Sequence, residues 1–426
     1  MDKQVFRWSR VLAGWLLCLS VAGWRYAAPH AGVIGGSTPP SAAEASSLEK
    51  AFQAAITASE AAQAAQSAEE WHVVANEWAT AIASLRAVPA DDPQWIFAQR
   101  KAQEYLENQI IAQQQAQTAG MPIVFPSLGS EVLDEQLGIY LSYTAIFGPP
   151  DVMIVGSSRA LQGINPQILQ RKLTQQGIAP IQVYTFAVNG ATAQVMNFLL
   201  QDLLTPEQLP RMVIWAGGSR SFNSAREDRT FTRIQNSPGF VALQGGDRPS
   251  FDWSDEARAA SVRGTPPRVS TINGYGFLPV TDVFAPERYY RHFPRVSGRY
   301  DASYQPFQLD GVQTNSLRAI ASYAENLAIP LVFVNLPLSS DYLDDTRLFY
   351  EQQFRQYLQQ EAARGNFTVI DLLQEWPTQH HFFADPSHLN QIGAAQVAVY
   401  LSEDVNIPWQ QFATLSSDSD SQVNKE

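Results

Sequence analysis

The chain is poor in cysteine and in basic residues. Its 426 residues include a single cysteine, Cys18, which excludes an internal disulfide framework and any cysteine-based metal cluster. Lysine and arginine number 29 against 41 aspartate and glutamate residues. The resulting net charge of −12 argues against nucleic acid as a partner, because binding phosphates needs a basic surface. The remaining composition, 45% hydrophobic and 16% charged, is that of an ordinary globular protein.

Long apolar runs are also scarce, and the one that stands out lies near the N-terminus. Lys3, Arg7 and Arg10 precede the apolar run 11–23. This run has the length of a signal-peptide core and is shorter than the roughly 20 apolar residues of a typical membrane span. We expect residues 1–29 to form an uncleaved signal anchor that leaves the bulk of the chain on the periplasmic side of the membrane. The alternative is a cleaved signal peptide and a secreted protein.

The composition changes sharply over the next part of the chain. Residues 30–42 are rich in glycine and proline, which predicts a linker. Residues 43–120 are rich in alanine, and their alanines and aromatics recur at helical spacing. This pattern predicts a small all-α module of antiparallel helices, similar to a tetratricopeptide hairpin, that packs against or docks a protein partner. The serine- and aspartate-rich tail 413–426 is predicted to be disordered.

Residues 145–403 alternate between apolar runs and amphipathic segments. The apolar runs predict five strands, at 151–155, 181–186, 212–216, 331–335 and 368–372. Strands that alternate with helices indicate an α/β domain with a parallel sheet covered on both faces. The pattern lapses over residues 224–310, where aromatic residues are frequent. We expect this insertion to form a lid or rim over a site.

Paired serines follow the first predicted strand. Gly156, Ser157 and Ser158 occupy a tight turn between that strand and a helix, where open α/β sheets bind ligands. A serine in this position is well sited for nucleophilic chemistry, and the helix points backbone N–H groups toward charge developing on a substrate oxygen. The alternative is an ordinary turn in which the hydroxyls cap the helix.

An acid and a histidine stand three residues apart near the C-terminus. Asp385 and His388 precede a predicted helix, and their spacing lets the carboxylate hold one imidazole nitrogen while the other faces the sheet edge. Ser158, His388 and Asp385 would then supply the nucleophile, the base and the orienting acid. One alternative is a helix cap beside a surface histidine. A second alternative is a metal site that adds His380 and His381. Adjacent histidines on an extended segment point to opposite faces, so both rarely bind one ion.

Together these motifs resemble the SGNH (GDSL-type) hydrolase superfamily over about residues 150–403. The resemblance rests on Gly-Ser-Ser after the first strand, a glycine-containing turn after the second, Gly217-x-Ser219 after the third, and Asp-x-x-His before the last helix. With its N-terminal segment and helical module, the chain looks most like the cyanobacterial DUF1574 group. It is distantly similar to the D-alanyl-lipoteichoic acid transfer protein DltD and to alginate O-acetylation proteins. The resemblance implies a flavodoxin-like three-layer α/β/α sandwich, ester chemistry, and Ser158 rather than Ser157 as nucleophile.

The resemblance also implies an oxyanion hole, and here the chain departs from the family pattern, since a serine stands where the family has an asparagine. The candidate donors are the backbone N–H groups of Ser158, Ala187 and Gly190 and the side chains of Ser219 and Asn223. An oxyanion hole needs donors rather than particular side chains, so the departure leaves both a working and a degenerate site open.

Two arginines, Arg159 and Arg220, each follow a turn at the expected site. Arginine suits bidentate recognition of carboxylate or phosphate, so both are candidates for binding an anionic sugar or phosphate group, with ion pairs to nearby carboxylates as the alternative. The sequence therefore predicts a serine-dependent esterase or O-acyltransferase that acts on an acylated saccharide or glycolipid of the cell envelope, with no metal or cofactor. The alternative is a catalytically degenerate binding or assembly factor of the envelope with the same fold.

Overall fold

A computed structural model describes residues 47–89, 92–118, 125–178, 181–250 and 271–413. The chain forms two compact units, and the first of them contains helices α2 to α4 while the second contains every described element from α5 onward. The segments predicted as anchor, linker and tail lie outside the described residues, apart from Ala413. Among the helices that the structure describes, none is both long and apolar enough to cross a membrane.

The described part of the first unit consists of three consecutive helices, α2 (Ser47–Ala64), α3 (Ala68–Arg86) and α4 (Trp95–Thr118). Alanines at helical spacing on α2 are fully buried, which lets the helices approach closely, and Trp78 of α3 packs on Tyr105 of α4 with ring centroids 5.0 Å apart. Ser67 and Glu70 form a reciprocal capping box that fixes the start of α3. The predicted helical module is therefore present.

The second unit is built on a five-stranded parallel sheet, which confirms the predicted α/β class. Its strands are β1 (Val152–Gly156), β2 (Val183–Ala187), β3 (Met212–Gly217), β4 (Leu331–Asn335) and β5 (Thr368–Asp371). They are hydrogen-bonded in the order β2-β1-β3-β4-β5. Every residue of the first four strands is buried, as expected of a parallel sheet with both faces covered. The order reverses direction between β1 and β3, where the carboxyl ends of the strands leave a crevice.

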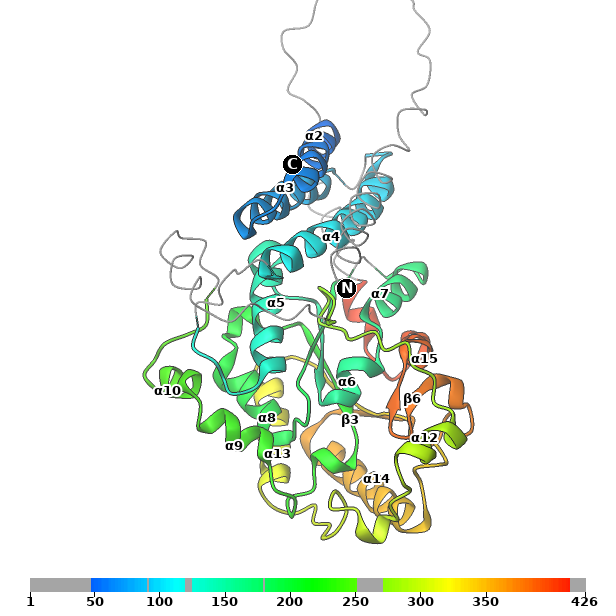
Figure 1. The fold of residues 1–426 in the computed structure, drawn as a ribbon. Helices are drawn as coiled ribbons and strands as arrows, with labels where there is room; N and C mark the ends of the chain where they lie inside the picture. The colour runs from blue at the N-terminus through cyan, green and yellow to red at the C-terminus, as the bar shows by residue number, and fades with distance from the viewer. Residues whose placement is uncertain (1–46, 90–91, 119–124, 179–180, 251–270, 414–426) are drawn as a thin grey trace, which may run out of the picture. The chain divides into compact units, whose positions relative to one another are not determined.

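Two groups of helices cover the sheet (Figure 1). One group is α6 (Ser158–Gly163), α7 (Pro166–Gln175) and α15 (Gln391–Glu403), which pack on one another. The other is α8 (Ala193–Phe198), α13 (Val312–Asn326) and α14 (Asp345–Gly365). Right-handed crossovers between parallel strands require the two groups to lie on opposite faces.

Helix α5 (Glu131–Phe147) precedes the sheet, where the sequence predicts one short strand or helix over residues 120–141 without distinguishing the two. It belongs to the second unit, and Tyr140 on it packs against Tyr184 and Phe186 of β2 with centroid distances of 5.0 and 5.2 Å. The edge strand β2 is thus covered by a helix that lies before the predicted domain boundary at residue 145.

The described residues of the insertion, 224–250 and 271–310, include short helices besides irregular chain. They are α9 (Arg229–Gln235), α10 (Pro238–Gln244), α12 (Pro286–His292) and a 3-10 turn over Gly298–Tyr300. The insertion returns to the sheet at Gly276, where the backbone N–H of Thr185 in β2 donates to the carbonyl of Tyr275. Its second half lies beside the carboxyl edge of the sheet, where the candidate site is found.

Candidate active site

Ser158 stands at the carboxyl end of β1 because the strand can turn sharply there. Gly156 has φ = +147°, and a Cβ at this residue would lie 2.1 Å from the carbonyl oxygen of Ala216 in β3. Only glycine fits this close approach. Ser157 caps helix α6, accepting a hydrogen bond from the backbone N–H of Arg159 at 3.4 Å. The alternative of a helix-capping serine therefore holds for Ser157, and the neighbouring Ser158 hydroxyl is left for another partner.

That partner is His388, on a two-stranded hairpin of β6 (Phe383–Asp385) and β7 (His388–Leu389). Ser158 Oγ lies 3.0 Å from His388 Nε2, and His388 Nδ1 lies 2.8 Å from Asp385 Oδ2. The three side chains that the sequence singles out are thus in contact, although Ser158 is 230 residues from the histidine. With the proton on Nδ1 held by the carboxylate, Nε2 is free to accept the Ser158 proton.

The hairpin turn fixes Asp385 through its second carboxylate oxygen. Oδ1 accepts hydrogen bonds from the backbone N–H groups of Ser387 and His388 at 2.8 and 3.0 Å. Burial alone would raise the pKa of Asp385. The hydrogen bond and charge of His388, together with hydrogen bonds from Ser387, bring this pKa below its ordinary value. Asp385 therefore remains a carboxylate at neutral pH.

The helix that follows the hairpin is tied to the insertion through Asn390. Its side-chain N–H₂ group donates to the carbonyls of Asp282, His381 and Phe383 at 3.0, 2.9 and 3.1 Å. Its oxygen accepts from the backbone N–H groups of Ile392 and Gly393 in the first turn of α15. One fully buried amide thus joins the hairpin, the insertion and the start of α15.

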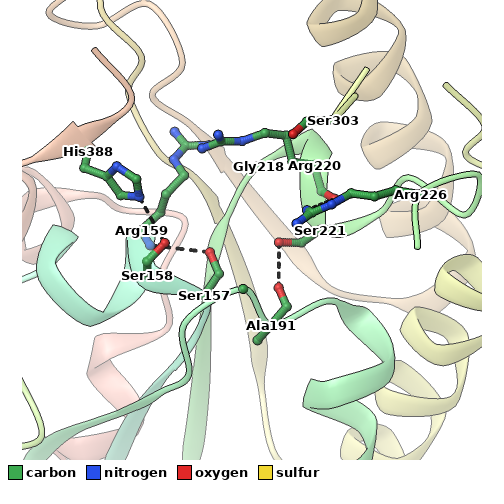
Figure 2. Close-up of a pocket in the computed structure, with 11 residues that line it drawn as sticks. Ser157, Ser158, Arg159, Ala191, Gly218, Arg220, Ser221, Arg226, Ser303 and His388 are labelled. Carbon is green, nitrogen blue, oxygen red and sulfur yellow. Dashed lines mark hydrogen bonds between the residues drawn. The ribbon is translucent and has the colours of Figure 1, made fainter. Parts of the chain in front are cut away.

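Ser158 and His388 open onto a cavity of about 110 Å³ (Figure 2). Its other lining residues are Ser157, Arg159, Gly190, Ala191, Gly218, Arg220, Ser221, Arg226 and Ser303. A wider groove of about 740 Å³ continues from His388 and Arg220 along the insertion. The aromatic side chains of Tyr289, Tyr290, Phe293, Tyr300 and Tyr342 line this groove. Residues of the insertion therefore do form a rim of the site, as predicted.

Two of the predicted oxyanion donors are wrong. The Ser219 hydroxyl is buried and donates to Glu351 Oε1 at 2.7 Å. The Asn223 amide is also buried and donates to the carbonyls of Ser303 and Pro306 at 3.0 and 2.8 Å. Neither residue lines the cavity, because each side chain satisfies groups inside the fold instead.

The backbone candidates divide in the same way. Ala187 is the last residue of β2, paired with Gly156, and does not line the cavity. Gly190 lines the cavity, with φ = +72°, as does Ser158. The backbone N–H groups of Ser158 and Gly190 therefore remain as candidate donors.

The arginines lie at the site, with one addition that the sequence reading missed. Arg159 is buried, and its guanidinium donates to the carbonyls of Leu336 and Pro337 at 2.5 and 3.0 Å. Arg220 lies over the ring of Tyr342, 5.4 Å from its centroid. Arg226, at the start of the insertion, lines the same cavity and was not predicted, because nothing in its local sequence marks a site.

The alternative metal site is not assembled. His380 Nε2 lies 2.8 Å from Asp341 Oδ2, and the His381 ring packs on Phe382 with centroids 4.3 Å apart. Within the described ranges, no group of three or more histidine, cysteine, aspartate or glutamate side chains is arranged to hold a metal ion.

Comparisons with models of known protein families and with curated proteins find no significant match to this chain.

Proposed function

We propose that the chain is a serine-dependent esterase or O-acyltransferase of the SGNH type. The observation that carries the proposal is the relay of two short contacts, 3.0 Å from Ser158 Oγ to His388 Nε2 and 2.8 Å from His388 Nδ1 to Asp385 Oδ2. The strand order β2-β1-β3-β4-β5 is that of flavodoxin-like sheets, which fits the fold that the resemblance implies.

The chemistry follows from the roles of the three groups. His388 Nε2 takes the hydroxyl proton as Ser158 Oγ attacks the acyl carbonyl, and Asp385 stabilises the imidazolium that forms. The backbone N–H groups of Ser158 and Gly190 receive the developing oxyanion. His388 then returns the proton to the leaving alkoxide, so that the acyl group stays on Ser158. Water or a saccharide hydroxyl, deprotonated by the same imidazole, accepts the acyl group in the second half-reaction.

The groove beside His388 is suited to hold the part of the substrate outside the bond that breaks. It is bordered by aromatic side chains, of which Tyr300 is 82% and Phe293 59% exposed. Aromatic faces offer apolar contact area for flat, amphipathic ligands such as sugar rings. With the predicted N-terminal signal anchor, this supports a saccharide or glycolipid of the cell envelope as substrate and a periplasmic location.

A second candidate, a noncatalytic binding or assembly factor, is favoured by one observation. Ser219 and Asn223, the side chains that would complete an oxyanion hole, both donate to other groups of the fold. Loss of one such donor typically lowers turnover about 10²–10³-fold.

Labelling with a fluorophosphonate probe separates the two candidates. Such a probe reacts with a serine that a neighbouring base activates, so we expect labelling of the wild type that is lost in Ser158→Ala. Ser157→Ala is the matched control and should still be labelled, because Ser157 caps α6 instead of contacting His388. Absence of labelling in folded wild-type protein would refute the enzymatic proposal and favour the binding factor.

A further inference from the structure

The cavity at Ser158 is lined by three guanidinium groups. Arg159, Arg220 and Arg226 share this space of about 110 Å³ with Ser158 and His388. Figure 2 shows the serine–histidine pair at one side of the cavity and Arg226 at the other. Among the residues that the structure describes, no carboxylate lies within ion-pair distance of any of the three arginines.

Another buried arginine of this protein, Arg347, does pair with carboxylates. The side chain of Arg347 is 7% exposed, and it lies 3.0 Å from Asp301 and 3.3 Å from Asp344. Arg159 is 5% exposed and has only carbonyl oxygens as acceptors for its guanidinium. A buried cation without a counterion is costly, so an unbalanced set of cations calls for an anion from elsewhere.

The charge of Arg220 acts on the other two arginines. Burial lowers the pKa of Arg220 itself, but Tyr342, Tyr304, Glu351 and Asp301 outweigh this effect and raise that pKa above its ordinary value. Burial, and next the positive charge of Arg220, lower the pKa of Arg159 to about 10. The same two causes lower the pKa of Arg226. A bound anion would offset the repulsion that Arg159 and Arg226 experience from Arg220, so the cluster favours binding of an anion.

The three arginines differ in how freely they can move. Arg159 is held against Gly218, where an added Cβ would lie 1.9 Å from its Nη1, and it acts as a fixed charge. Arg220 and Arg226 are half-buried. The Arg220 guanidinium donates to the Tyr342 hydroxyl and that of Arg226 to the backbone carbonyl of Arg220, each at 3.4 Å. Their forks are therefore available for a bidentate contact with a ligand.

We propose that this cavity is an anion subsite that binds a carboxylate or phosphate group of the substrate, next to the ester that Ser158 attacks. The assignment to a substrate rests on the proposed acyl transfer, whereas the binding of an anion does not. The substrate class that follows is an acyl ester of a uronic acid-type or phosphate-bearing saccharide or glycolipid.

The test is isothermal titration calorimetry on the full chain carrying Ser158→Ala, which prevents turnover. Glucuronate and glycerol 3-phosphate are the anionic probes and distinguish a carboxylate from a phosphate; glucose and glycerol are the neutral ones. We expect saturable binding of at least one anion, weakened at least tenfold by an added Arg226→Gln. Arg229→Gln is the matched control and should bind as before, since Arg229 is 78% exposed and pairs with Glu227 at 3.0 Å.

Arg220→Gln is a second loss-of-charge variant, and thermal melting identifies whichever of the two stays folded. Absence of saturable binding of both anions, or equal affinity in the folded Arg226→Gln or Arg220→Gln protein, would overturn the subsite. Because calorimetry needs no turnover, the outcomes separate from the labelling experiment. Anion binding without labelling refutes only the acyl transfer, and labelling without anion binding refutes only the subsite.

Discussion

Replacement of Asp385 by asparagine tests the relay most directly. The carboxylate uses Oδ1 for two backbone N–H groups of the hairpin turn and Oδ2 for His388 Nδ1. An asparagine has one oxygen. If that oxygen stays hydrogen-bonded to the turn, the N–H₂ group of the asparagine faces His388 Nδ1 and forces the imidazole proton to Nε2. Nε2 can then no longer accept the proton of Ser158.

The expected size of the effect follows from this loss of tautomer. The corresponding change in serine proteases lowers kcat about 10⁴-fold, which is about 5 kcal/mol at 1.36 kcal/mol per factor of ten. We expect Asp385→Asn to lose a comparable factor in the rate of fluorophosphonate labelling and in hydrolysis of a nitrophenyl ester.

Asp151→Asn is the control for this experiment. Asp151 contacts Arg211 at 3.0 Å and accepts from the backbone N–H of Gln182, at the amino end of the sheet and away from the site. Its rate should equal that of the wild type. A folded Asp385→Asn protein that keeps its rate within about tenfold of wild type would show that the carboxylate does not set the histidine tautomer.

Three further outcomes are expected. Gly156→Ala should lower the free energy of unfolding by at least about 2 kcal/mol, because it combines a positive φ with a clash against Ala216. Gly217→Ala should cost less, because no atom lies closer than 3.9 Å to the added Cβ, and equal urea midpoints of the two variants would contradict this. Ser157→Ala should cost about 1 kcal/mol by loss of the helix cap while labelling persists, and loss of labelling in a folded variant would be the contrary result. Because the folded pKa of Asp385 lies below its unfolded value near 3.9, its contribution to stability is present above about pH 4 and is lost as the pH falls through the folded pKa. Between about pH 5 and about pH 2.5 the melting temperature should therefore fall more steeply for the wild type than for Asp385→Asn. Parallel curves would refute the lowered pKa of Asp385.

The sheet could be predicted because its strands are short apolar runs bounded by turn residues. The predicted bounds of β1 to β5 differ from the observed ones by no more than two residues. Over residues 120–141 the sequence predicts only a short strand or helix and does not decide between them, because residues 136–141 are buried without interruption, which removes the one-sided pattern of an amphipathic helix.

The site could be predicted only where local sequence fixes it. Ser158 follows from a turn at a strand end and the Asp385–His388 pair from its spacing before a helix, and the three side chains are in contact. Ser219 and Asn223 stand in a similar turn, but their orientation depends on partners far along the chain, such as Glu351, 132 residues from Ser219. Such tertiary partners carry no signal in the neighbouring sequence.

The Asn390 amide limits which part of the insertion can be exchanged to change the substrate specificity of this protein. Because it binds the carbonyl of Asp282 as well as two carbonyls of the segment that carries the imidazole, exchange of the whole insertion would strip one acceptor from the support of His388. A chimera that keeps the native chain at Asp282 and replaces only residues 289–300, which line the groove, retains this acceptor, so new specificity can be introduced there without loosening the general base.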